Sequence, residues 1–119
     1  MAKLRHIALS VPDPEAAARF FEEAFDMKRV GEARRGIYVS DGVFNVALLR
    51  TEDGEEVGPI HFGMWVDDFD AAKRQIEAAG GKCVRGKPDT PKSYYEAKFV
   101  DPNGITFDVT HTGWVGAKK

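Results

Sequence analysis

Two segments of the chain alternate between apolar residues and polar or small residues, as a β-strand with one buried face does. In residues 4–11 the apolar face carries Ile7, Leu9 and Val11, and the opposite face carries His6, Ala8 and Ser10. In residues 59–66 the apolar face carries Ile60, Phe62, Met64 and Val66, and the opposite face carries His61, Gly63 and Trp65. We therefore predict two strands, each with one histidine on the face turned away from the apolar core.

A helical pattern follows each of these strands. Residues 12–25 offer Asp13 as an N-cap and Pro14 at the first helical position, ahead of an apolar stripe at helical spacing. Residues 67–81 repeat this pattern and end in the glycine pair 80–81, which predicts the end of the helix. After each helix the pattern predicts three further strands, at residues 28–33, 35–40 and 43–50 and at residues 82–87, 94–100 and 105–111.

The two halves of the chain repeat one another. When His6 is placed on His61, an offset of 55 residues (61 − 6), residues 5–32 align with residues 60–87 without a gap. The turn aspartates, helix alanines and a glycine match as well as the histidines, which two unrelated amphipathic helices would not explain. We predict an α+β fold in which two tandem βαβββ modules form one domain, with the sheets curled into a cup. The modules span residues 1–51 and 60–119, and residues 52–59 form a polar linker.

The last predicted strand adds an acid to the two histidines. In residues 105–111 the apolar face carries Ile105, Phe107 and Val109, and Asp108 lies mid-strand on the opposite face, where a carboxylate is unfavourable without a partner. If the sheet curls, His6, His61 and Asp108 line one hollow, and two imidazoles with one carboxylate suit a divalent metal ion. The alternatives are a hydrogen-bonded structural role for each histidine and an ion pair between Asp108 and Lys98.

Composition limits the class of protein. With 119 residues, 43% of them hydrophobic, the chain is long enough for one domain with its own core. The net charge of −2 and the mixed charge pattern argue against a nucleic-acid partner. The single cysteine, Cys83, cannot form a disulfide within the chain, which agrees with a cytoplasmic protein. The first apolar run is too short for a signal sequence or a membrane span, so we expect no membrane partner.

The doubled pattern resembles the vicinal oxygen chelate superfamily, which includes glyoxalase I, extradiol dioxygenases, methylmalonyl-CoA epimerase and bleomycin-resistance proteins. The resemblance covers nearly the whole chain and is carried by "HIALSVPDPEAAARFFEEAFDMKRV", "IHFGMWVDD" and "FVDPNGITFDV". In this family the metal ligands lie on the first and last strands of each module, which implies His6, His61 and Asp108. The family's ligand on the last strand is usually glutamate, so Asp108 is a shorter variant.

The first module departs from the family at its last strand. When the turn glycines Gly42 and Gly104 are aligned, Val46 takes the place of Asp108, and valine cannot bind a metal. A shift by one residue would offer Asn45, whose side chain is expected to face the other way. The set of two histidines and one carboxylate is therefore closer to that of extradiol dioxygenases, and it argues against glyoxalase I activity.

Further candidates share the inner face of the predicted cup. Lys98 and Tyr38 occupy equivalent strand positions and are candidate catalytic residues, although many extradiol relatives carry a tyrosine where Lys98 stands. The candidate substrate contacts are Trp65, Phe44, Ser10 and Trp114. Trp65 and Phe44 would enclose a flat substrate, and Trp114 would cover the rim of the hollow. The alternative is that these aromatic residues only pack the core.

Two functions remain open at this stage. The first is a metal-dependent enzyme that holds vicinal oxygens of a small substrate, of the dioxygenase type or the lyase and isomerase type of glyoxalases. It would carry one divalent ion, from the group Fe, Mn, Zn, Ni and Co. The second is a metal-free drug-binding protein of the bleomycin-resistance type, with an aromatic and acidic hollow. By analogy with the family, we expect a homodimer.

Overall fold

The chain runs twice through the order strand, helix and three strands, which confirms the predicted fold class. The computed structural model describes residues 1–89 and 94–119. The first half contains β1 (Lys3–Val11), α1 (Pro14–Phe25), β2 (Lys28–Ala33), β3 (Gly36–Ser40) and β4 (Asn45–Arg50). The second half contains β5 (Gly58–Trp65), α2 (Phe69–Ala78), β6 (Lys82–Arg85), β7 (Ala97–Val100) and β8 (Thr106–Thr110).

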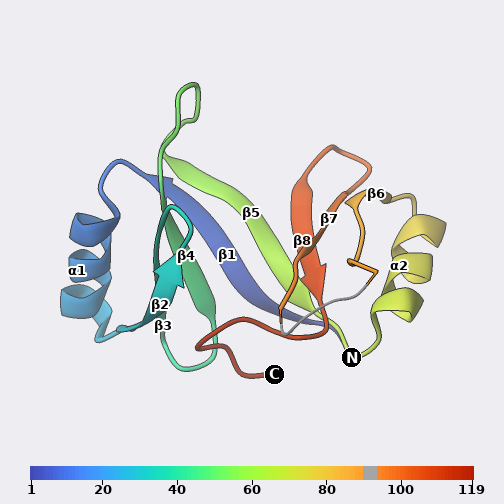
Figure 1. Cartoon of the computed structure of the whole chain (residues 1–119), viewed down its shortest axis with the longest axis horizontal. Coiled ribbons are helices and arrows are strands. Elements are labelled where there is room, and N and C mark those ends of the chain that lie inside the picture. Colours follow the sequence, from blue (N-terminus) through green and yellow to red (C-terminus); the bar gives the residue numbers. More distant parts are fainter. Residues whose placement is uncertain (90–93) are drawn as a thin grey trace.

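The strands form one curled sheet of eight strands in the order β2-β3-β4-β1-β5-β8-β7-β6. The two halves meet at the antiparallel pair β1–β5, and a parallel pair, β1–β4 or β5–β8, lies on either side of it. One helix flanks each end of the sheet, with α1 beside β2 to β4 and α2 beside β6 (Figure 1). The inner face of the curled sheet is therefore left for polar side chains.

Local capping explains where the helices begin and end. The Asp13 carboxylate accepts a hydrogen bond from the Ala16 amide at 3.2 Å, and Asp68 caps α2 in the same way through the Ala71 amide. Helix α2 ends as predicted, because Gly80 adopts a φ of 102° and the amide of the next glycine donates to the Ile76 carbonyl at 2.9 Å. The repeated aspartate caps are thus a shared structural device of the two halves.

Each helix covers its own apolar cluster on the outer face of the sheet. Under α1, the buried residues Ala18, Val39 and Leu48 pack with half-buried neighbours that include Val46. Under α2, the cluster contains Val66, Phe69, Tyr95, Ala97, Phe99 and Val109. These two clusters use the outward-facing positions of the strands, and the inner positions are free for the site.

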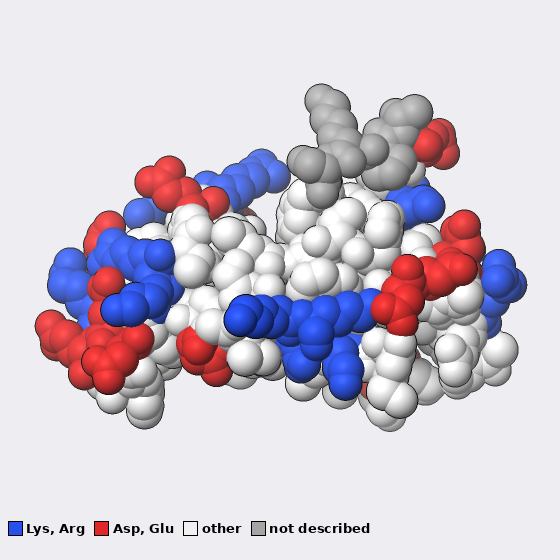
Figure 2. All heavy atoms as spheres, turned by 90° about the horizontal axis from the view of Figure 1, so that it is seen from below, with Lys and Arg blue, Asp and Glu red and all other residues white. Residues whose placement is uncertain are grey.

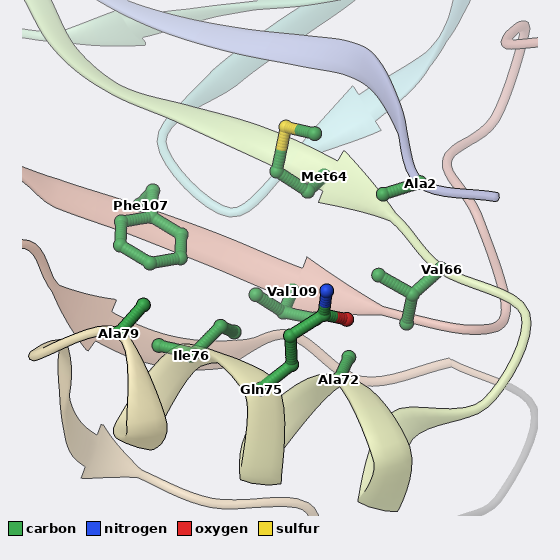
Figure 3. Close-up of a pocket in the computed structure, with 9 residues that line it drawn as sticks. All are labelled: Ala2, Met64, Val66, Ala72, Gln75, Ile76, Ala79, Phe107 and Val109. Atoms are coloured by element: carbon green, nitrogen blue, oxygen red, sulfur yellow. The ribbon is translucent and has the colours of Figure 1, made fainter.

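A cavity of about 260 Å³ remains between α2 and strands β5 and β8 (Figure 3). It is lined by Ala2, Met64, Val66, Ala72, Gln75, Ile76, Ala79, Phe107 and Val109. At the repeat offset, Ile76 corresponds to Phe21, which packs against the core under α1. The smaller side chain of Ile76 fills less of the space beneath its helix.

Residues 111–119, called the C-terminal segment here, cross from β8 to the ends of β3 and β4 (Figure 1). The Ser40 hydroxyl donates to the Gly116 carbonyl at 2.7 Å, and the Lys118 amide donates to the Val43 carbonyl at 3.0 Å. Trp114 is only 5% exposed. The segment therefore lies along one side of the curled sheet and contributes Trp114 to the buried interior.

The face that carries the two chain ends has Lys and Arg side chains in a band across its middle, with Asp and Glu gathered toward both sides (Figure 2).

Over residues 1–89 and 94–119, no helix has the length and apolar character needed to cross a membrane.

A substitution at Gly63 would show how tightly Trp114 of the C-terminal segment packs against β5. A Cβ atom at this position would lie 2.6 Å from two ring atoms of Trp114 and 3.0 Å from the His6 Cβ. We predict that Gly63→Ala lowers the free energy of unfolding by about 1–3 kcal/mol, because the indole has to move from a packed position. Urea denaturation measures the change.

Gly31→Ala is the matched control, since a Cβ there meets its first neighbour at 3.5 Å, an ordinary contact distance. We expect it to change stability by less than about 0.5 kcal/mol. Equal stabilities for Gly63→Ala and the wild type would contradict the close packing of Trp114.

Candidate metal centre

The four central strands bring one row of residues together on the inner face of the sheet. His6 on β1 pairs with Asn45 on β4 and with Gly63 on β5, and Gly63 pairs with Asp108 on β8. His61 lies two residues from Gly63 on the same strand, so it shares the same face. Sequence positions as distant as 6 and 108 thus become neighbours through strand order alone.

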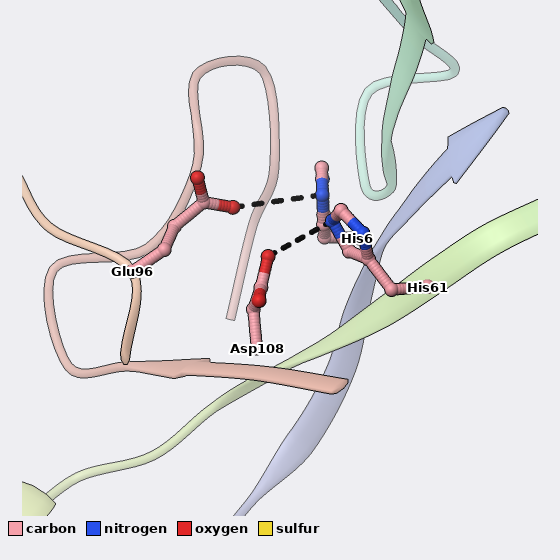
Figure 4. A group of neighbouring side chains, drawn as sticks. All are labelled: His6, His61, Glu96 and Asp108. Atoms are coloured by element: carbon pink, nitrogen blue, oxygen red, sulfur yellow. Dashed lines mark ion pairs between the residues drawn. The ribbon is translucent and has the colours of Figure 1, made fainter. Parts of the chain in front are cut away.

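Four side chains converge at this row (Figure 4). One ligand atom from each of His6, His61, Glu96 and Asp108 lies within 4.8 Å of the others. The His61 Nε2 atom is 2.9 Å from Asp108 Oδ2, and the His6 Nε2 atom is 3.6 Å from Glu96 Oε2. All four come from one chain, so the cluster needs no second copy.

Glu96 is the member that the sequence analysis missed. It directly precedes β7, whose predicted start at residue 94 is wrong because the strand begins at Ala97. Glu96 is two residues before Lys98, which the sequence analysis already placed on the inner face, and strand parity would have placed Glu96 there too. The signal was present, but the uncertain start of the strand obscured it.

Asp108 is buried between two nitrogen donors. Lys98 Nζ lies 2.6 Å from Oδ1, and His61 lies against the other carboxylate oxygen. Burial alone would raise the pKa of Asp108, but the hydrogen bonds and charges of His61 and Lys98 outweigh it and hold the pKa well below its usual range. Asp108 therefore stays ionised, and it both forms the structural ion pair with Lys98 and presents an oxygen to the cluster.

Two further members of the cluster, the buried His6 and the half-buried Glu96, lean toward their neutral forms. Burial lowers the pKa of His6 from 6.5 to about 4, against the opposing effect of its hydrogen bond with Asn45. Burial also raises the pKa of Glu96, and the nearby Asp108 carboxylate adds to that effect. The site thus holds two imidazoles and two carboxylates, and one of the carboxylates, Asp108, is paired with Lys98.

Trp114 covers the cluster from one side. Its ring stacks on the His6 imidazole, with centroids 4.8 Å apart and planes tilted by 3°. Its indole N–H donates to Glu96 Oε2 at 2.9 Å. One side chain therefore contacts both the His6 ring and the Glu96 carboxylate, and a substrate role for Trp114 stays a prediction.

A pocket of about 520 Å³ lies beside this tryptophan and is lined by Glu32, Tyr38, Tyr94, Thr112, Gly113, Trp114 and Val115. Burial raises the pKa of Tyr38, and the charges of Glu96 and Asp108 raise it further. The pKa of Tyr94 is raised by the same causes, burial and then Glu96. Both phenols stay protonated and can donate a hydrogen bond into the pocket.

Three predicted substrate contacts lie elsewhere in the described part of the chain. The Trp65 indole donates to the His111 carbonyl at 3.1 Å and packs against Gly113. Phe44 is half-buried in the turn before β4, and Ser10 is fully buried on β1. None of these three is among the residues that line the pocket beside Trp114. A substrate role for them stays a prediction.

The predicted orientation of β4 is wrong by one residue. Val46 packs into the apolar cluster under α1, whereas Asn45 is completely buried on the inner face, 2.6 Å from His6 Nδ1. β4 begins three residues after Gly42, but β8 begins two residues after Gly104, so aligning the turn glycines misplaces the strand. The true counterpart of Asp108 is Ala47. Ala47 pairs with Ala8 and Asp108 pairs with Gly63, and Ala8 and Gly63 are equivalent at the repeat offset of 55 residues.

A model of the Glyoxalase/Bleomycin resistance protein/Dioxygenase superfamily matches residues 3–109. A Mn(II)-bound glyoxalase from Novosphingobium aromaticivorans is similar in structure, with a TM-score of 0.74 and 24% identity over all of this chain and 42% of that one. A methylmalonyl-CoA epimerase variant from Streptomyces coelicolor, in complex with 2-nitronate-propionyl-CoA, gives a TM-score of 0.72 and 16% identity, and covers 90% of this chain and 94% of that one.

The 2,3-dioxygenase LapB from Pseudomonas sp. KL28 has a TM-score of 0.70 and 13% identity, over 97% of this chain. This chain spans 42% of the length of LapB, as it does for the glyoxalase. At these identities the likeness establishes the fold.

The shifted pKa of His6 leads to a pH-dependent stability. Its value of about 4 in the folded, metal-free chain lies below the 6.5 of an exposed imidazole, so between these pH values the unfolded chain binds a proton that the folded chain lacks. We predict that stability falls as the pH drops from 6.5 toward 4, by on the order of 3 kcal/mol for this group.

NMR titration of the His6 ring gives the folded-state pKa, and urea unfolding at several pH values gives the stability change. His6→Gln removes the group and is expected to flatten this part of the profile. A His6 midpoint at or above 6.5 would contradict the buried, neutral imidazole.

Proposed function

The chain belongs to the Glyoxalase/Bleomycin resistance protein/Dioxygenase superfamily, and we propose that it is a metal-dependent enzyme of this superfamily. In the proposal, His6, His61 and Asp108 hold one divalent ion, and the ion binds neighbouring oxygens of a small substrate. The observation that carries the proposal is the convergence of two imidazoles and two carboxylates within 4.8 Å, on the inner face of the sheet. A structural histidine or ion pair alone would not require all four.

The chemistry of the donor set fits a divalent ion. Imidazole nitrogens and carboxylate oxygens together suit Fe, Mn, Zn, Ni or Co. Glu96 and Asp108 lie close together in a buried site, and this proximity contributes to the raised pKa of Glu96. A divalent cation at the cluster would favour the ionised form of both acids, which is the form that binds a metal.

When bound, such an ion supplies Lewis-acid stabilisation of negative charge on a substrate oxygen. The residues of the chain provide the rest. Lys98 holds Asp108 in place through their 2.6 Å contact. The neutral phenol of Tyr38 can donate a hydrogen bond to a substrate in the adjoining pocket. These contacts support a positioning role for Lys98 and a binding role for Tyr38.

Glu96 supports one reaction type over another. Glu96 lies within reach of the proposed ion, and its carboxylate can accept a proton when it is ionised. Removal of a proton next to a carbonyl is the common need of lyases and isomerases of the glyoxalase and epimerase types. We therefore favour this type over ring cleavage by O₂, with Glu96 in the part of proton acceptor or fourth donor.

The metal-free drug-binding function has one observation in its favour. The pocket beside Trp114 is walled by three aromatic side chains and carries Glu32, which would suit a flat cationic ligand. Such a protein would have no use for the converged histidines, so metal binding separates the two functions.

We predict that chelator-treated protein takes up one divalent ion per chain when Mn(II), Co(II), Ni(II) or Zn(II) is added. His61→Ala and Asp108→Asn are each expected to weaken the binding by at least about 100-fold, because the first removes a donor nitrogen and the second removes the negative charge and one oxygen of the carboxylate. Isothermal titration calorimetry gives the affinity, and elemental analysis gives the stoichiometry.

His111→Ala is the control, since this exposed histidine pairs with the Tyr95 hydroxyl outside the cluster. Its affinity should match that of the wild type. A wild-type protein that gains no stoichiometric ion, but binds a cationic aromatic dye in the pocket, would overturn the enzyme proposal in favour of the binding function.

A further inference from the structure

Asn45 is a fully buried amide that bridges the candidate metal centre and the C-terminal segment. Its Oδ1 atom lies 2.6 Å from His6 Nδ1, and its Nδ2 atom donates to the Val115 carbonyl at 2.8 Å. The first contact follows from strand register, because Asn45 and His6 are direct partners on the parallel strands β4 and β1.

The two contacts together fix which ring nitrogen of His6 carries a hydrogen. A backbone carbonyl only accepts hydrogen bonds, so the NH₂ group of Asn45 has to face Val115. The amide oxygen, which also only accepts, then faces His6 Nδ1. The hydrogen between them can come only from the ring, and Nδ1 is therefore the protonated nitrogen.

We propose that Asn45 is a positioning residue that holds His6 in the Nδ1–H tautomer, so that the Nε2 lone pair faces the cluster. The C-terminal segment takes part, because the Val115 carbonyl prevents the amide from turning over. The value of this arrangement for metal binding rests on the proposed function, but the tautomer itself is a property of the metal-free chain.

His6 needs such a device because its other nitrogen has a competing partner. Nε2 lies 3.6 Å from Glu96 Oε2, and whenever Glu96 is ionised its carboxylate favours a hydrogen on Nε2. A hydrogen there would block the nitrogen that points at the cluster. The direct 2.6 Å contact with Asn45 is the shorter of the two and keeps the hydrogen on the far side of the ring.

His61 is arranged differently. Its Nε2 atom lies 2.9 Å from the ionised Asp108, which favours a hydrogen on that nitrogen in the metal-free chain. The two histidines of the repeat thus differ in the metal-free chain. The Nε2 atom of His6 presents a lone pair to the cluster, whereas the Nε2 atom of His61 would have to lose its hydrogen before it could bind a metal.

The test measures the tautomer directly. Two-bond ¹H–¹⁵N correlations of the metal-free wild type should show His6 Nδ1 protonated and Nε2 unprotonated. Asn45→Leu removes the acceptor, and the Nε2–H tautomer should then become populated. Asn45→Asp keeps an oxygen for His6 but loses the donor to Val115, and it should retain the Nδ1–H tautomer.

Ser40→Ala is the matched control for the C-terminal segment. It removes the hydrogen bond to Gly116 from the strand position next to Asn45, without touching His6. We expect it to leave the tautomer unchanged and the affinity for Zn(II) within about twofold. Asn45→Leu should weaken that affinity by about 10–100-fold, the usual effect of losing the partner that orients a ligating histidine.

The outcomes separate this inference from the proposed function. A wild-type His6 with its hydrogen on Nε2, or a sole Nδ1–H tautomer in Asn45→Leu, would overturn the role of Asn45. So would an equal loss of affinity in Ser40→Ala, which would assign the effect to the segment alone. If the wild type shows the Nδ1–H tautomer but binds no metal, the positioning stands and the metal proposal fails. Should Asn45→Leu fail to fold, the wild-type tautomer and Asn45→Asp still decide the matter.

Discussion

The antiparallel pairing of β1 with β5 is the interaction on which the rest of the structure depends. It joins the two halves into one sheet and places the parallel partners β4 and β8 on either side. The row formed by Asn45, His6, Gly63 and Asp108 exists only in this register. A slip by one residue would turn the histidines toward the helices and leave their apolar neighbours in the hollow.

In and beside that row, the buried Asn45, His6 and Asp108 and the half-buried Glu96 have hydrogen-bonding partners of matching chemistry. Lys98 and His61 face the two oxygens of Asp108, the Trp114 indole faces Glu96, and the Asn45 amide faces both His6 and a backbone carbonyl. Such mutual satisfaction makes buried polar residues tolerable and gives them defined orientations. The convergence of two imidazoles and two carboxylates within 4.8 Å of one another is the physical reason to expect a cation at this place.

Strand alternation and the internal repeat are enough to place His6, His61 and Asp108 on one face of the sheet from the amino-acid sequence alone. They fail at Asn45, because the two turns before β4 and β8 differ by one residue in length and nothing in the sequence marks that difference. Glu96 is two positions from a residue that parity places on the inner face, so the same parity could have found it. The stacking of Trp114 on His6 is beyond pattern analysis, because the C-terminal segment has no regular period and its path is set by tertiary contacts.

The joining of the halves through β1 and β5 also affects the rates at which the chain folds and unfolds. His6 and Asp108 are separated by 102 positions (108 − 6) along the chain, yet only β5 lies between their strands in the sheet. Contacts of such long sequence separation form late in folding, because the entropy of closing a large loop is lost before the contacts can stabilise the chain. A ligand held by both residues would act as a clamp across that closure and slow the reopening of the seam between β1 and β5.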